Sequence, residues 1–153
     1  MNNTINNPKE YPVIVTLSVK NILRNVYATS ALAVAGRITP PDHYQLLDED
    51  HRPLLNTIVL NGFVNTVLPF AGYVRDTDIS QIDDDILSLE VMKSFLDNAG
   101  KMKLFQAMVE QGIVLYVLSQ VFSIEDGMED VAQRYHEDFY TQISRIAQYL
   151  SLN

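Results

Sequence analysis

The feature that most limits how this chain folds is an uncharged segment near its middle. No acidic or basic residue occurs among the 22 residues from Pro53 to Val74. A segment of that length could cross a bilayer as one helix. However, Thr57, Asn61 and Asn65 recur every fourth residue and would share one helix face, and polar side chains on a lone span are costly in lipid. The segment therefore predicts a soluble helix that is buried on most sides, with a narrow polar stripe and no membrane span.

Length and composition favour a single soluble domain. The chain has 153 residues, of which 47% are hydrophobic and 20% are charged, as in globular proteins with one core. The net charge of -8 argues against direct nucleic-acid binding, because phosphate contacts need clustered Lys and Arg. The absence of cysteine excludes disulfides and thiolate catalysis. The polar first ten residues lack a signal-peptide core, so we expect a flexible arm over 1–10 and one helical domain over 11–153.

Apolar residues at helical spacing predict four helices. The third is apolar nearly all round in its later half, so we expect it to be the central element and to leave surface for neighbouring subunits. The short link before the fourth helix favours an antiparallel hairpin. The first helix is predicted from Val19 to about Ala35, with Ser18 as N-cap. The second has Asp50 as N-cap and Pro53 in its first turn, and it reaches about Leu68 or Phe70. The third runs from about Lys101 to Phe122, and the fourth from near Glu125 or Asp126 to near Leu150.

Two short segments have strand character. Ile86–Met92 is predicted as a strand, and a lone strand needs a partner. The β-branched segment Tyr11–Leu17 is the natural candidate. The fold class is therefore predicted to be mainly α, a four-helix bundle-like domain with a small β element formed by short strands near 12–17 and 86–92.

An acidic stretch, "DTDISQIDDD", covers residues 76–85. It starts like an EF-hand calcium loop, with oxygen ligands at its first, third and fifth positions. The sixth and twelfth positions would require glycine and a bidentate acid, and here they are Gln81 and Leu87. A solvated acidic loop beside the following strand is therefore preferred, and no metal is predicted. The loop supplies candidate interaction residues Asp76, Asp78, Asp83, Asp84 and Asp85.

Reactive groups follow no catalytic pattern. His43 and His51 flank acidic residues but lack the spacing of known metal motifs, so helix-cap and surface roles are preferred. The sequence contains neither a nucleophile motif nor a glycine-rich phosphate loop, so we expect no enzyme, no catalytic residue and no cofactor. Tyr140 and Tyr149 lie off the apolar stripe of the last helix and join the candidate interaction residues.

The order of elements resembles that of a known group of proteins. The run from Leu17 to Ala35, the "DEDHRPLLNTIVLNGFVNTVLPF" helix, the "ILSLEV" strand and the final helix pair are similar to those of small helical head–tail connector or neck-adaptor proteins of tailed phages and prophages. The resemblance implies a non-enzymatic virion component, found in the virion or the host cytoplasm. It also implies a homo-oligomer that joins a portal or tail ring, and it assigns no catalytic residue.

Two alternatives remain open. The chain could be a monomeric or dimeric acidic module that binds or regulates a basic partner protein. It could also be an enzyme or metal protein whose site forms only in three dimensions. The oligomeric state in solution distinguishes the assembling protein from the binding module.

Overall fold

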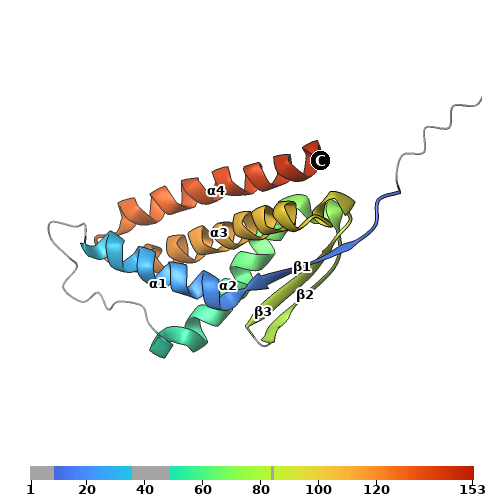
Figure 1. The fold of residues 1–153 in the computed structure, drawn as a ribbon. Helices are drawn as coiled ribbons and strands as arrows, with labels where there is room; N and C mark the ends of the chain where they lie inside the picture. Colours follow the sequence, from blue (N-terminus) through green and yellow to red (C-terminus); the bar gives the residue numbers. More distant parts are fainter. Residues whose placement is uncertain (1–8, 36–48, 84) are drawn as a thin grey trace, which may run out of the picture.

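A computed structural model describes residues 9–35, 49–83 and 85–153, and Figure 1 shows their arrangement. Four helices and a small antiparallel sheet confirm the predicted fold class. Three short 3-10 turns, η1 (Glu49–His51), η2 (Leu68–Tyr73) and η3 (Ser94–Leu96), adjoin them. The elements are β1 (Val13–Ser18), α1 (Val19–Ala35), α2 (Arg52–Val67), β2 (Val74–Asp83), β3 (Ile86–Val91), α3 (Ala99–Ser123) and α4 (Glu129–Leu152).

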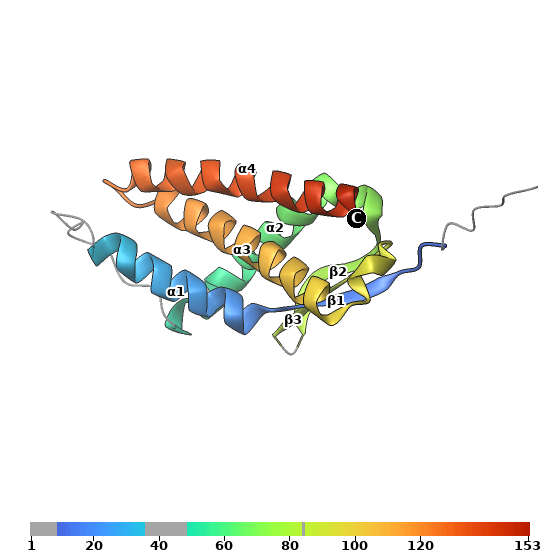
Figure 2. The ribbon, with the colours of Figure 1, turned by 45° about the horizontal axis from the view of Figure 1, so that its top comes forward.

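Helix α3 is the centre of the molecule, as its sequence predicts. Figure 2 shows α3 between α1 and α4, and α2 crosses on its far side. The later half of α3 is almost wholly buried, including Val114, Leu115 and Leu118. The expectation that the later half of this helix leaves apolar surface for neighbouring subunits is wrong, because other elements of the same chain cover it, although Leu104 in its first half is 51% exposed.

Helices α2 and α3 approach each other closely through glycines. A Cβ atom on Gly62 of α2 would lie 2.9 Å from Cδ1 of Tyr116, and one on Gly112 of α3 would lie 2.9 Å from Cγ2 of Thr66. Each glycine thus accepts a larger side chain of the other helix. The hydroxyl of Thr66 is buried and donates to the carbonyl oxygen of Gly62 at 2.7 Å. This crossing fixes which face of α2 points outward.

The sheet has the order β1–β3–β2, and all neighbours are antiparallel. The predicted pairing of the first strand with the segment after residue 86 is confirmed, with Val15 opposite Leu89 and Leu17 opposite Leu87. These four residues are buried, whereas Ile14, which points to the other face, is 65% exposed. One face of the sheet therefore packs on the helices, and the other faces outward.

Strand β2 corrects the prediction of an acidic loop. Residues 76–83 are extended and pair with β3, with register shifts between Val74 and Asp76 and between Asp78 and Asp83. A central strand has two hydrogen-bonding edges, and β1 occupies only one of them. Aspartate has a low strand propensity, but strand propensity depends strongly on tertiary context. The pairing with β3 outweighs it here. Charged residues are common on edge strands, where they prevent pairing with other chains.

Local hydrogen bonds set several helix ends. The Ser18 Oγ atom accepts from the backbone N–H of Asn21 at 3.1 Å, so the predicted cap of α1 is confirmed. Asp50 is not the cap of α2, because η1 precedes the helix and His51 is the N-cap residue. Gly127, at a φ of 81°, completes the turn after α3, and α4 therefore begins at Glu129, later than predicted.

The predicted N-terminal arm and the stretch between α1 and α2, which includes His43, lie largely outside the described residues. Glu10, the last residue of the predicted arm, is described and accepts hydrogen bonds from the backbone N–H and the hydroxyl of Ser94, at 2.6 and 2.8 Å. This contact ties the start of β1 to η3.

Among the described residues, two helical segments are long and apolar enough to cross a membrane by length and composition alone. They are residues Glu49–Tyr73 and Ala99–Ser123. In the most apolar window of each segment, 39% and 56% respectively is buried within the chain. Core packing of α3 accounts for its apolar character. Thr57, Asn61 and Asn65 are exposed on one face of α2, as their spacing predicts.

Candidate functional site

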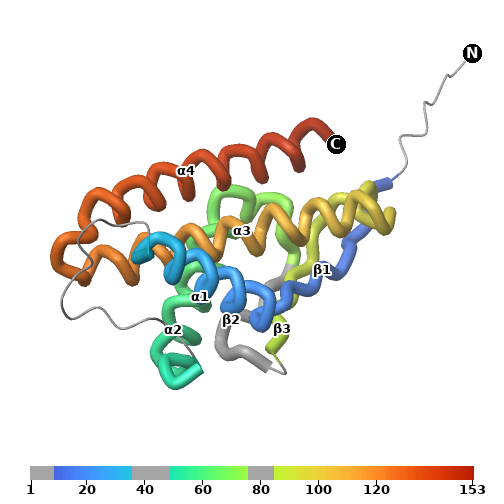
Figure 3. The backbone as a smooth tube through the Cα atoms, turned by 60° about the vertical axis from the view of Figure 1, so that its left-hand side comes forward, coloured from blue at the N-terminus to red at the C-terminus, as the bar shows by residue number. Residues whose placement is uncertain are grey.

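The acidic candidates are distributed along a hairpin. The backbone register sets Asp76 opposite Glu90, Asp78 opposite Ser88, and Asp83 opposite Ile86. The side chains of residues 76–84 lie outside what the structure describes, as does all of Asp84. Figure 3 shows β3 beside β1, its partner on the other side. Asp76, Asp78 and Asp83 therefore belong to an edge strand, and Asp85 lies in the turn before β3.

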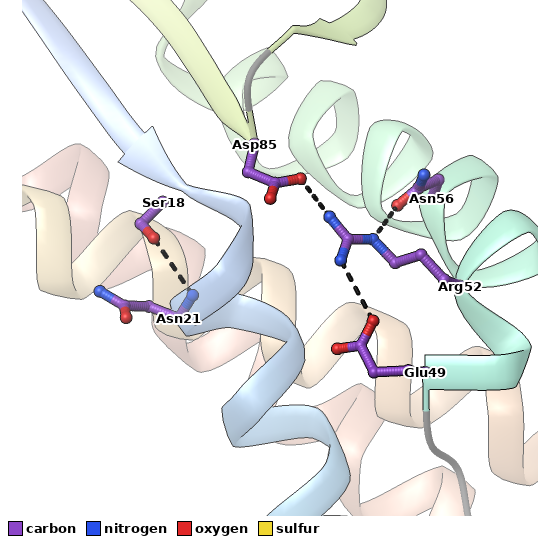
Figure 4. A network of polar contacts seen from close by, with 6 residues as sticks. All are labelled: Ser18, Asn21, Glu49, Arg52, Asn56 and Asp85. Atoms are coloured by element: carbon purple, nitrogen blue, oxygen red, sulfur yellow. Dashed lines mark hydrogen bonds and ion pairs between the residues drawn. The ribbon is translucent and has the colours of Figure 1, made fainter.

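Asp85 is the acidic candidate whose side chain is described, and it binds Arg52 (Figure 4). The guanidinium group of Arg52 also contacts Glu49 at 3.4 Å and donates through Nε to Oδ1 of Asn56 at 2.9 Å. This network joins the first turn of α2 to the β2–β3 hairpin. The charge of Asp85 is thus partly neutralised by its own chain, which reduces what it offers to a partner.

The backbone of Asp85 has a structural role as well. Its φ is 60°, a left-handed conformation that Asp tolerates better than most residues. Its carbonyl oxygen accepts from the backbone N–H of Val19 at 2.8 Å, which links the hairpin turn to the start of α1. Asp85 is therefore best explained as the residue that holds β3, α1 and α2 together.

The two tyrosine candidates lie in different environments. Tyr140 is 55% exposed, and its ring makes an edge contact with the ring of His136, with a centroid distance of 4.8 Å. Tyr149 is only partly exposed and packs edge-on against Phe95 at 5.4 Å. Only Tyr140 retains the exposure expected of a contact residue. A shallow cleft of about 350 Å³ between α3 and α4 lies near it, with His136 and Gln133 in its lining.

A second cleft was not anticipated from the sequence. It has a volume of about 400 Å³, lies where β1 meets α1 above α3, and contains Ser18, Lys103 and Glu110 in its lining. The Glu110 Oε1 atom accepts from the backbone N–H of Ser18 at 2.7 Å, and Gln106 donates to the carbonyl oxygen of Thr16 at 2.8 Å. Side chains of α3 thus occupy hydrogen-bonding positions on the outer edge of β1 that another strand would use.

Glu110 is the residue of this cleft with a clearly altered acidity. Burial raises the pKa of its carboxyl group, and the hydrogen bond from Ser18 opposes part of that rise. Cations are not among the causes of the shift, although Lys103 lines the same cleft. The arrangement explains a capped strand edge.

The Glu110→Gln variant is expected to gain stability relative to the wild type as the pH rises. Because the pKa of Glu110 is higher in the folded than in the unfolded protein, folding disfavours its ionised form. Glu110 therefore adds its full contribution to the free energy of unfolding below the unfolded pKa. That contribution is lost as the pH rises through the folded pKa. Glutamine keeps an acceptor for Ser18 but carries no charge. Urea denaturation of both proteins from pH 4 to pH 7 measures the difference, and a difference independent of pH would contradict the assignment.

The outward face of α2 carries no charge. We give the name α2 outer stripe to five exposed residues that follow one another at spacings of three or four along this face and into the start of η2. Leu54 and Leu68, at 59% and 66% exposure, lie at its ends. Its members are Leu54, Thr57, Asn61, Asn65 and Leu68. Because Leu68 has helical φ and ψ of -51° and -43°, it continues the face of the helix. Sequence periodicity identified the polar centre of this stripe but assigned its leucines to the core.

Within the described ranges, no three His, Cys, Asp or Glu side chains converge as a metal site requires. Comparisons of the chain with protein-family models, with curated proteins and with solved structures gave no match. Its function is therefore inferred from its own surface, of which the α2 outer stripe is the most distinctive part.

Proposed function

We propose that this protein is a non-enzymatic structural or adaptor protein that assembles as a homo-oligomer, of the head–tail connector or neck kind found in tailed-phage particles. The order of its elements supports the virion role, through the resemblance to small helical neck proteins. Its partners would be further copies of itself and a portal or tail ring.

The observation that carries self-assembly is the α2 outer stripe. Helix α2 packs its inner face on α3 through Gly62 and Thr66, so the stripe is held outward by a rigid crossing. Leu54 and Leu68 are 59% and 66% exposed, and they lie at the two ends of this uncharged face. Burial of these two side chains against a protein partner would remove their apolar surface from water, which stabilises the contact.

The charge distribution favours the same surface. A chain with a net charge of -8 repels its own copies wherever two acidic surfaces meet. The segment between residues 53 and 74 contributes no charge to that repulsion. It is therefore the part of the surface where two copies approach each other at the lowest electrostatic cost.

Multi-angle light scattering of the full chain over a range of concentrations tests the proposal. We expect a mass above that of the monomer, and we expect Leu54→Glu to lower it by adding a charge to the stripe. Leu32→Glu is the matched control, because Leu32 is 74% exposed on α1 and lies outside the stripe. A strict monomer at all concentrations would contradict self-assembly and favour the alternative, an acidic module for a basic partner.

A further inference from the structure

We infer that the α2 outer stripe pairs with the same stripe of a second copy of this chain, in antiparallel orientation, about a two-fold axis beside Asn61. This inference rests on the proposed function, since it names the face that carries self-association. It adds the partner, the orientation and the residue at the axis.

The spacing of the stripe is symmetric about Asn61. Leu54 lies seven residues before Asn61 and Leu68 lies seven residues after it, so each is two helical turns away on the same face. An antiparallel pair centred on Asn61 sets each Leu54 against Leu68 of the partner subunit. Thr57 then faces Asn65 of the partner subunit. Apolar residues thus meet apolar ones, and polar residues meet polar ones.

Asn61 is suited to the position on the axis. A side-chain amide both donates and accepts, so two facing Asn61 amides satisfy each other when the contact excludes water. The Nδ2 atom of Asn65 donates to the backbone carbonyl of Asn61 at 2.8 Å, whereas the Asn61 side chain has no hydrogen-bond partner within the described residues. A polar residue between two leucines in a helical seam fixes the register of the pair.

The acidic residues at the start of α2 favour the antiparallel orientation. Glu49 and Asp50 lie in η1, directly before the helix, and both are exposed. A parallel pair would set these carboxylates beside their own copies, which is electrostatically unfavourable. An antiparallel pair separates them by the length of α2, about 24 Å at 1.5 Å per residue.

The size of the stripe sets the strength of the contact. From Leu54 to Leu68 the helix rises about 21 Å, which gives a smaller contact than the roughly 800 Å² per partner of a standard interface. We therefore expect an association that depends on concentration in the micromolar range. A disulfide that links the two chains detects such a weak dimer more reliably than a measurement of its mass in solution.

Single-cysteine variants provide the test, because the chain has no cysteine of its own. In the Asn61→Cys variant the two thiols lie beside the axis, so mild oxidation should link two chains. We expect the linked dimer to form at least about tenfold faster than for the control, because a held pair raises the effective concentration. The matched control is Gln148→Cys, at an exposed position of α4.

Two further variants test the orientation. A mixture of Leu54→Cys and Leu68→Cys chains, one of them carrying a mass tag, should give the mixed disulfide, and each variant alone should link no faster than the Gln148→Cys control. Rapid linking of each variant alone would overturn the antiparallel arrangement, because away from the axis only a parallel pair sets identical positions together.

The failure of this inference is distinguishable from that of the proposed function. If light scattering shows an oligomer but Asn61→Cys links no faster than its control, the pairing through α2 is overturned and self-assembly stands. If the chain is a monomer and none of the cysteine variants links faster than the control, both are overturned.

Discussion

Replacing Gly112 with valine is expected to destabilise the protein by about 3 kcal/mol, as overpacking of a tight core does. Even a Cβ atom at this position would lie 2.9 Å from the methyl carbon of Thr66. Thr66 cannot easily turn its methyl group away, because its buried hydroxyl is bonded to the carbonyl of Gly62 at 2.7 Å. Helices α2 and α3 would therefore have to separate. Chemical denaturation measures the loss in the free energy of unfolding.

Gly72 provides the control for that substitution. A Cβ atom on Gly72 would meet nothing within 4 Å, and its backbone is not in the left-handed region. Gly72→Ala should therefore change the free energy of unfolding by less than about 0.5 kcal/mol. If Gly112→Val were as mild as Gly72→Ala, the close crossing of α2 and α3 would be wrong. The outward direction of the stripe on α2 would then lose its support.

The Phe105→Ala variant is expected to lose about 3 to 5 kcal/mol, because it leaves a cavity at the centre of the core. Phe105 is fully buried on α3, and its ring packs edge-on against Phe70, with a centroid distance of 6.0 Å. Phe70 lies in η2 at a non-helical φ and ψ of -117° and 22°, where the chain turns from α2 toward the sheet. The loss would be a large part of the total stability of a typical domain, about 5 to 15 kcal/mol.

The neighbouring Leu104 is the matched control, because it is 51% exposed on the same turn of α3. Leu104→Ala should cost less than about 1 kcal/mol in the monomer. Thermal unfolding and urea denaturation of both variants compare the two positions. Equal losses at Phe105 and Leu104 would contradict the described orientation of α3.

The helices could be predicted because their signals are local. Ser18 followed by apolar residues at helical spacing predicted α1, and the buried Val131, Phe139 and Ile146 follow the stripe predicted for α4. The nearly continuous apolar run in α3 predicted its central position. Each of these patterns lies within a few helical turns, where spacing alone decides which side chains share a face.

The sheet and the clefts depend on contacts between distant residues. Aspartates made β2 resemble a loop, and its pairing with β3 follows from an edge that only the folded chain presents. Glu110 belongs to no motif, and its partner Ser18 is 92 residues away. In the sequence it is one of many acidic residues on a helix. The direction of the leucines on α2 also depends on the glycine crossing, which periodicity does not reveal.

The hydrogen bonds that Gln106 and Glu110 make to β1 limit how copies of this protein can accumulate. A strand border with vacant backbone groups is a template on which identical chains polymerise into fibres. Here part of that border is occupied from within the molecule, at Thr16 and Ser18. Fibre growth by stacking strands is therefore disfavoured on this side of the sheet.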